Sequence, residues 1–272
     1  MTSPSPPPRD HIIVQDLVKK FGDTFVLRGI SLSVPRGDTA VIIGGSGAGK
    51  TTLLRILIGL ERPTSGHVFI DGIDIAAMSG RGLDRVRKKF GMVFQYSALL
   101  DSLTVLDNVA FPLREHTKLK PRDVREKVLL MLETLGLRRT DADKMPSELS
   151  GGMRKRVALA RALMLEPEII IYDEPTSGLD PITSRMVDDL IGETRERFNV
   201  TSVVISHDMA STFRIAHRAF LLIQGELVAS GTPDQLADAS RNQVSHDFIV
   251  ASGVAWERMS RPELARLQSK GQ

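Results

Sequence analysis

The 272-residue sequence predicts an α/β protein built on a mostly parallel sheet. Three observations support this fold class. Short apolar segments alternate with helical patterns over residues 169–230, the order that parallel strands require. Two strand-like stretches joined by a turn predict an N-terminal antiparallel β subdomain within residues 11–37. Residues 96–165 carry helical periodicity and interrupt the alternation, so we interpret them as an inserted α-helical subdomain.

Turn and cap residues predict where the individual elements begin and end. Gly22-Asp23 is expected to join one pair of antiparallel strands, and Gln224-Gly225 another. Pro121 suits the first turn of a helix, and Gly136 suits the position just after its end. Pro167 stops a second helix. The expected strands are 11–21, 25–34, 38–43, 67–71, 169–172 and 202–205 with a hairpin over 219–230, and the expected helices are 50–60, 121–135, 152–165 and 182–197.

The composition excludes several classes of protein. Hydrophobic residues make up 42% and charged residues 25%, which are ordinary values for a globular protein and exclude a fibrous or wholly disordered chain. No run of about eighteen apolar residues predicts a transmembrane helix, and no apolar segment near the N-terminus predicts a secretory signal. The absence of cysteine excludes a disulfide scaffold and fits a reducing compartment. We therefore expect a soluble, cytoplasmic protein.

Both ends of the chain and one internal segment depart from this pattern. Residues 1–10 are proline-rich and are expected to form a disordered tail. Residues 241–272 are expected to form a C-terminal extension, which either clasps a neighbouring subunit around Trp256 or packs on its own domain. Residues 114–161 hold 13 Lys and Arg against 7 Asp and Glu, a local charge of +6 in a chain of net charge +3. This excess suits either an anionic surface or a solvated helical face.

Residues 44–51, Gly-Gly-Ser-Gly-Ala-Gly-Lys-Thr, fit the phosphate-loop pattern G-x-x-x-x-G-K-[S/T] between an expected strand and an expected helix. Glycines let the backbone wrap around a phosphate, and the helix N-terminus adds the positive end of its dipole. Lys50 is expected to reach the β- and γ-phosphates, and the Thr51 hydroxyl to bind Mg²⁺. The expected nucleotide contacts are Gly44, Gly45, Ser46, Gly47, Ala48, Gly49, Lys50, Thr51 and Thr52.

Polar side chains follow two more of the expected strands. Asp173 and Glu174 come directly after the apolar strand 169–172. We assign Asp173 to Mg²⁺ and Glu174 to the water that attacks the γ-phosphate. His207 follows strand 202–205 and can donate to the γ-phosphate. Alone, the two acids are equally consistent with exposed acids at a strand end, and a lone histidine is more often structural. The phosphate loop upstream favours the catalytic assignments of Glu174 and His207, together with Lys50.

The segment Leu149-Ser-Gly-Gly-Met153 precedes an expected helix and predicts a second anion site at its N-terminus. The alternative is an ordinary helix cap with Ser150 as the N-cap residue. One chain does not need two γ-phosphate sites, but two chains arranged head to tail do. Each phosphate loop would then be covered by Ser150, Gly151 and Gly152 of the partner.

These motifs, in this order, resemble the ATP-binding cassette (ABC) ATPases over about residues 11–238. The resemblance implies a P-loop NTPase (RecA-like) core in an ATPase domain of residues 11–240, and a homodimer that sandwiches ATP and Mg²⁺ and drives a partner. It implies that Gln95 touches Mg²⁺ or the attacking water and that Asp180 links the two sites across the dimer. It also implies that Phe21 stacks on adenine, although a core phenylalanine is an alternative.

Three segments resemble, more narrowly, the ATPase subunit of Mla/Mce-type lipid transporters. They are residues 94–99, 108–117 and 145–153, and they flank the groove in which an ABC ATPase receives its permease. The resemblance implies a multipass permease of the MlaE type, an MCE-domain protein, a small STAS-domain subunit, and phospholipid or other hydrophobic cargo moved between membranes. The ATPase would lie peripherally on the cytoplasmic face of the inner membrane. Met153 departs from the common pattern of ABC ATPases in general, which have Gln at this position.

Other functions fit the sequence less well. An ATPase subunit of another importer, for amino acids or ions, is the alternative within the same class. DNA-repair relatives have a long coiled coil between the phosphate loop and the signature, which is residues 149–153 here, whereas only about 100 residues separate the two in this chain. Translation-factor relatives usually carry two cassettes. A P-loop kinase or GTPase would leave residues 149–153 unexplained. We therefore expect no nucleic-acid partner.

Overall fold

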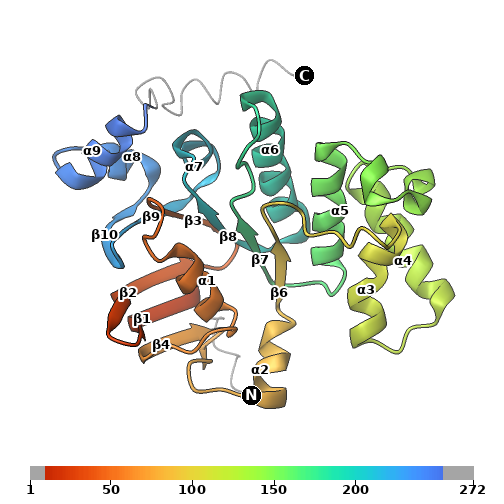
Figure 1. Cartoon of the computed structure of the whole chain (residues 1–272), viewed down its shortest axis with the longest axis horizontal. Coiled ribbons are helices and arrows are strands. Elements are labelled where there is room, and N and C mark those ends of the chain that lie inside the picture. The colour runs from red at the N-terminus through yellow and green to blue at the C-terminus, as the bar shows by residue number, and fades with distance from the viewer. Residues whose placement is uncertain (1–9, 254–272) are drawn as a thin grey trace, which may run out of the picture. The chain divides into compact units, whose positions relative to one another are not determined.

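The computed structural model describes residues 10–253 (Figure 1). The described chain divides into two compact units. The first unit comprises residues 10–78 and 205–253 of the described chain, and the second comprises residues 79–204. The expected disordered tail falls mostly on residues 1–9, which lie outside the described residues. Trp256, in the expected C-terminal extension, also lies outside them.

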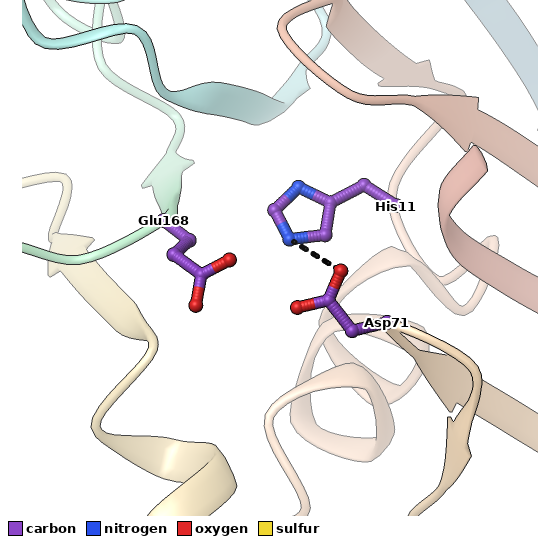
Figure 2. A group of neighbouring side chains, drawn as sticks. All are labelled: His11, Asp71 and Glu168. Carbon is purple, nitrogen blue, oxygen red and sulfur yellow. Dashed lines mark ion pairs between the residues drawn. The ribbon is translucent and has the colours of Figure 1, made fainter. Parts of the chain in front are cut away.

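The first unit contains the expected antiparallel β subdomain. Its sheet has the order β2-β1-β4-β5, and β1 pairs antiparallel with both β2 and β4. At the start of β1, the buried His11 Nε2 lies 3.7 Å from Asp71 Oδ1 in the turn after β4 (Figure 2). The strands are β1 (Asp10–Phe21), β2 (Thr24–Pro35), β4 (Ser65–Ile70) and β5 (Ile73–Asp74).

Parallel pairing begins in the same unit, at β3 (Thr39–Ile43). All of its residues are buried, and it pairs in parallel with β9 (Arg218–Ile223). β9 turns at Gln224-Gly225 into the antiparallel β10 (Glu226–Gly231), which confirms the expected hairpin. The helices of this unit are α1 (Lys50–Leu57), α7 (Met209–Ile215), α8 (Pro233–Ala237) and α9 (Gln243–Ala251).

In the second unit, the strands run in the order β8-β7-β6, and β6 and β7 pair in parallel. The helices α3, α4 and α5 pack against one another as the helical subdomain, and α5 also packs against β6 (Figure 1). The elements are α2 (Gly80–Arg87), β6 (Phe90–Val93), α3 (Val105–His116), α4 (Pro121–Thr134), α5 (Gly151–Leu163), β7 (Ile169–Asp173), α6 (Pro181–Phe198) and β8 (Thr201–Ser206), with short 3₁₀ turns η1 (Arg139–Asp143) and η2 (Pro146–Glu148).

The predicted cap residues of α4 lie at the two ends of this helix. Pro121 opens α4, and Gly136, at φ 74°, lies just beyond its end. The strand β6 and the helix α2 were not anticipated, and α9 lies within the expected C-terminal extension. Among residues 10–253, no helix has the length and hydropathy needed to span a membrane.

Candidate functional site

The phosphate loop joins the buried strand β3 to helix α1 in the first unit. α1 begins at Lys50, its N-cap residue is Gly49, and no side chain caps its first turn. The first turn also holds no acidic residue. The backbone N–H groups of a helix N-terminus attract anions when no side chain satisfies them, so this end of α1 fits a phosphate group.

Two glycines of the loop lie against neighbouring backbone. A Cβ added at Gly44 would clash with the carbonyl oxygen of Leu222 on β9. Gly49 has a φ of 103°, and a Cβ there would come within 2.9 Å of the carbonyl oxygen of Val26 on β2. Packing therefore demands glycine at these positions whether or not nucleotide is bound.

The turn of the β9–β10 hairpin, which lies far along the chain, also contacts the phosphate loop. The N–H of Gly225 donates to the carbonyl oxygen of Ala48 at 3.1 Å. The carbonyl of Gly225 accepts from the N–H of Arg28 at 2.8 Å. The turn thereby links the loop to β2, and it fixes the loop backbone from a segment far along the chain.

The remaining predicted residues of the first unit are accessible. Lys50 donates from Nζ to the carbonyl oxygens of Gly44, at 2.8 Å, and Gly45, at 3.0 Å. Phe21 is 51% exposed, with the Lys19 ammonium 4.6 Å from its ring centre. His207 is exposed and follows the end of β8. Each can therefore meet a ligand from solvent.

In the second unit, the predicted acids end a buried strand. Residues 169–172 of β7 are buried, Asp173 is its last residue, and Glu174 follows it. Glu174 has a φ of 47°, in the left-handed region that non-glycine residues seldom adopt. The carbonyl oxygen of Glu174 accepts from the N–H of Ser177 at 3.2 Å, which closes a turn around this conformation.

Gln95 lies in the same hydrogen-bonded group. Its Nε2 donates to Ser177 Oγ at 3.0 Å, which leaves the amide oxygen as the atom that can face a ligand. The backbone carbonyl of Gln95 accepts from Lys155 Nζ. The structure therefore brings Gln95 and Glu174 together through Ser177.

The signature segment, residues 149–153, forms the helix cap that was the alternative interpretation, and the anion site remains a prediction. Ser150 is the N-cap residue of α5, and its Oγ accepts from the N–H of Met153 at 3.3 Å. Gly151 and Gly152 are exposed, and a Cβ added at either would meet nothing within 4 Å. The cap is real, and the start of α5 is also open to a group approaching from outside.

Asp180 caps the next helix of this unit. One of its carboxylate oxygens, Oδ1, accepts from the N–H groups of Ile182 and Thr183, each at 3.0 Å. The hydrogen bond from the Thr183 hydroxyl, together with these backbone bonds, lowers the pKa of the Asp180 carboxyl. Asp180 is therefore ionised at neutral pH and remains exposed.

Two functional candidates escaped prediction from the sequence. Lys155 and Arg161 look like ordinary charges in a basic stretch, yet Lys155 is only 8% exposed. Arg161 donates from its guanidinium to the carbonyl oxygens of Ser97 and Ala98. The signal was present, because Lys155 lies four residues before the buried Leu159 and hence on the buried face of α5.

The predicted residues are divided between the two units. The phosphate loop, Phe21 and His207 belong to the first, and Gln95, Asp173, Glu174, the signature and Asp180 to the second. The oxygen donors Thr51, Gln95 and Asp173 have the hydroxyl, amide and carboxylate chemistry that Mg²⁺ prefers. The uncapped start of α1 and the glycine backbone beside it fit the phosphates of a nucleotide.

A buried strand, a glycine loop in which Gly44 and Gly49 have no room for a Cβ, and an uncapped helix N-terminus define a P-loop nucleotide-binding protein. A family model described as "ABC transporter" matches residues 27–177. The chain belongs to this family and is an ABC ATPase, which confirms the resemblance inferred from its motifs.

Individual relatives agree with this assignment. The Haemophilus influenzae protein named "Intermembrane phospholipid transport system ATP-binding protein MlaF" is 45% identical over 83% of this chain and 85% of its own. The Escherichia coli K12 protein of the same name is 47% identical over 79% of this chain and 80% of its own. A dimeric ATP-binding cassette, MJ0796 with ADP and Pi, has a TM-score of 0.72 and 33% identity, covering 82% of this chain and 98% of that one.

Proposed function

We propose that this chain is the ATP-hydrolysing subunit of a transporter that moves phospholipid, or another hydrophobic cargo, between membranes. The observation that carries the proposal is the identity of 45–47% to two proteins named as phospholipid transport ATPases, over about four fifths of this chain. The three segments that flank the permease groove in ABC ATPases, residues 94–99, 108–117 and 145–153, had suggested the same subfamily.

The first unit supplies the nucleotide contacts. Residues 44–52 hold the phosphates through backbone N–H groups, and the Lys50 ammonium neutralises the β- and γ-phosphates. Phe21 offers its exposed ring to the adenine. Thr51, with Asp173 and Gln95 of the second unit, would hold Mg²⁺. Bound there, Mg²⁺ supplies charge neutralisation on the phosphate oxygens.

Hydrolysis requires a base and a donor. Glu174 accepts a proton from the attacking water, and its half-buried position at the end of β7 fits this task. His207 donates a hydrogen bond to the γ-phosphate as charge develops on it. The amide oxygen of Gln95 orients the water or Mg²⁺. The side-chain types and their exposure support these roles.

The active form is a homodimer, in which Ser150, Gly151 and Gly152 of one chain cover the nucleotide of the other. The open start of α5 supports this role, and MJ0796 is dimeric. Asp180 lies near this interface.

Ser150→Arg places a bulky cation at the start of α5. We expect nucleotide affinity to stay within about twofold while ATP-dependent dimers disappear from size-exclusion chromatography. Dimers that persist in this variant would contradict the composite site.

A groove in the second unit suits a membrane partner. Its volume is about 430 Å³, and aromatic and aliphatic side chains line it, including Phe94, Leu100 and Phe111, which are 39–46% exposed. Exposed apolar side chains that line one groove mark an interaction site more often than scattered ones do. We assign it to a multipass permease of the MlaE type, with an MCE-domain protein and a small STAS-domain subunit in the assembly.

The charge distribution suits this location. The +6 excess of residues 114–161 falls in the helical subdomain, where it would face the anionic inner surface of the membrane. We place the protein peripherally on the cytoplasmic face of the inner membrane.

Affinity purification in mild detergent tests the proposal. The tagged chain is extracted from its own membranes, and the co-purifying proteins and lipids are identified by mass spectrometry. A multipass permease together with an MCE-domain protein and bound phospholipid is the expected result. An amino-acid or ion permease would contradict the lipid cargo and leave the assignment as a transport ATPase in place. Ribosomal or DNA-repair proteins without a permease would contradict the proposal.

A further inference from the structure

Helix α5 begins at the signature and carries a buried cation. Lys155 is 8% exposed, and burial lowers the pKa of its ammonium group. Its Nζ donates to the backbone carbonyl of Gln95. A buried charge costs more than an apolar side chain of similar length would, so packing alone does not account for a lysine here.

The segment that follows Gln95 is held in an unusual conformation. Ser97 and Ala98 have φ angles of 64° and 44°, two consecutive non-glycine residues in the left-handed region. Arg161, also on α5, donates to the carbonyl oxygens of Ser97 at 3.0 Å and Ala98 at 2.7 Å. Two cations of α5 therefore fix the backbone from Gln95 to Ala98.

The path continues from Gln95 to the proposed base. Gln95 Nε2 donates to Ser177 Oγ at 3.0 Å, and the N–H of Ser177 donates to the carbonyl oxygen of Glu174 at 3.2 Å. Glu174 itself is held at a φ of 47°. Three hydrogen bonds thus connect α5, the helix that starts with the signature, to the residue that would activate water.

We infer that Lys155 is a positioning residue that couples occupancy of the signature to Gln95 and Glu174. A phosphate or partner chain that contacts Ser150–Gly152 shifts the N-terminal half of α5, and Lys155 transmits the shift to the carbonyl of Gln95. Hydrolysis then depends on closure of the dimer. The inference rests on the proposed function of Glu174 and of the signature.

The chain offers a matched control on the same helix. Arg156, the next residue, donates from Nη1 to the carbonyl oxygen of Leu135 at 2.6 Å. It is also a cation of α5 that bonds a backbone carbonyl, but that carbonyl belongs to the residue after α4 and lies off the path. Lys155→Met and Arg156→Met therefore remove comparable structural contacts and differ in their connection to Gln95.

The test measures steady-state ATPase activity and equilibrium binding of a fluorescent ATP analogue, on the full chain purified with its co-extracting subunits. For Lys155→Met we expect kcat to fall about tenfold or more while nucleotide affinity stays within about twofold, because positioning acts on the chemical step. Lys155→Arg, which retains a cationic donor, should recover most of kcat. Arg156→Met should lower the melting temperature with kcat within about twofold of wild type.

A double-mutant cycle with Ser177→Ala then tests the path itself. The double variant Lys155→Met/Ser177→Ala should be no slower than the slower single variant, because both substitutions interrupt one path. Multiplicative effects, or equal kcat losses in Lys155→Met and Arg156→Met, would overturn the inference and leave the proposed function standing. A wild-type protein without ATP turnover would overturn both.

Discussion

We assign anions to the N-termini of two helices of this protein, α1 and α5, and these two N-termini are built differently. α1 has no side-chain cap, and Gly44 and Gly49 beside it lie so close to neighbouring backbone that a Cβ could not fit without movement. α5 has a side-chain cap, and Gly151 and Gly152 at its start have open space around them. Glycine is demanded by the fold at the first helix and not at the second.

The difference separates two uses of glycine. At α1 the missing side chains make room for the protein's own backbone, so the loop is shaped before any ligand arrives. At α5 the missing side chains leave open space at the start of the helix. Only a group from outside the unit can occupy that space, and the proposed homodimer supplies such a group. The phosphate loop is therefore shaped within one unit, whereas the role proposed for the start of α5 requires a partner chain.

The largest expected effect is on the rate of ATP hydrolysis, with ATP binding retained. Glu174→Gln removes the proposed base and keeps the side-chain volume. We expect the ATPase rate to fall about 10²- to 10⁴-fold, with ATP affinity retained and dimers accumulating in ATP. Phosphate release and size-exclusion chromatography measure these changes. Turnover at the wild-type rate would show that another group activates water.

Lys50→Ala, at the start of α1, is expected to affect nucleotide binding itself. Removing the ammonium that faces the phosphates should weaken nucleotide binding about 10- to 100-fold, the worth of one charge-assisted hydrogen bond. Isothermal titration with ATP measures it. Unchanged affinity would show that the loop backbone alone carries the binding energy.

A pair of glycine substitutions tests the comparison directly. Gly44→Ala forces a methyl group against the carbonyl of Leu222 and should destabilise the protein by about 1–3 kcal/mol. Gly151→Ala should leave stability unchanged or raise it, since alanine favours a helix over glycine by about 1 kcal/mol. It should nevertheless slow ATP hydrolysis. Denaturant titration and ATPase assays report the two effects. Equal destabilisation by both substitutions would remove the contrast.

The smallest effect concerns the helical subdomain that carries α5. Hydrogen bonds from Arg138 and Lys144 hold the pKa of the buried Asp141 carboxyl well below its usual range. Its stabilisation is therefore complete above the carboxyl's unfolded pKa of about 4, and it is lost as pH falls from there toward the folded pKa. Asp141→Asn should cost about 1 kcal/mol at pH 7 and less at low pH. Urea unfolding at pH 7 and pH 3.5 measures this, and an equal cost at both pH values would rule out the ionised carboxyl as its source.

Local patterns were sufficient for much of the fold. Periodicity and turn residues identified the antiparallel β subdomain and the parallel strands other than β6. The bounds of α4 were found because Pro121 and Gly136 act through their own backbone preferences. The phosphate loop and the acids at the end of β7 were found because each follows a short, largely apolar stretch. Each of these signals lies within one short, continuous stretch of the sequence.

Features that depend on distant packing were missed. β6 has the short sequence Phe-Gly-Met-Val, and Gly91 within it weakens a strand pattern. A Cβ at Gly91 would come within 2.7 Å of the carbonyl oxygen of Ala162, so this glycine serves the contact with α5. The role of Lys155 likewise depends on Gln95, 60 positions earlier. Such pairings exist only after folding.

The hairpin turn that supports the phosphate loop has a consequence for synthesis on the ribosome. The loop occupies residues 44–51, but Leu222 and Gly225, which brace it, are made more than 170 residues later. A contact this distant in sequence forms late and slowly. A nascent chain shorter than about 225 residues therefore lacks part of the support for its nucleotide loop. Competence to bind ATP should emerge only after the β9–β10 hairpin has been translated, which keeps shorter nascent chains from entering the ATPase cycle.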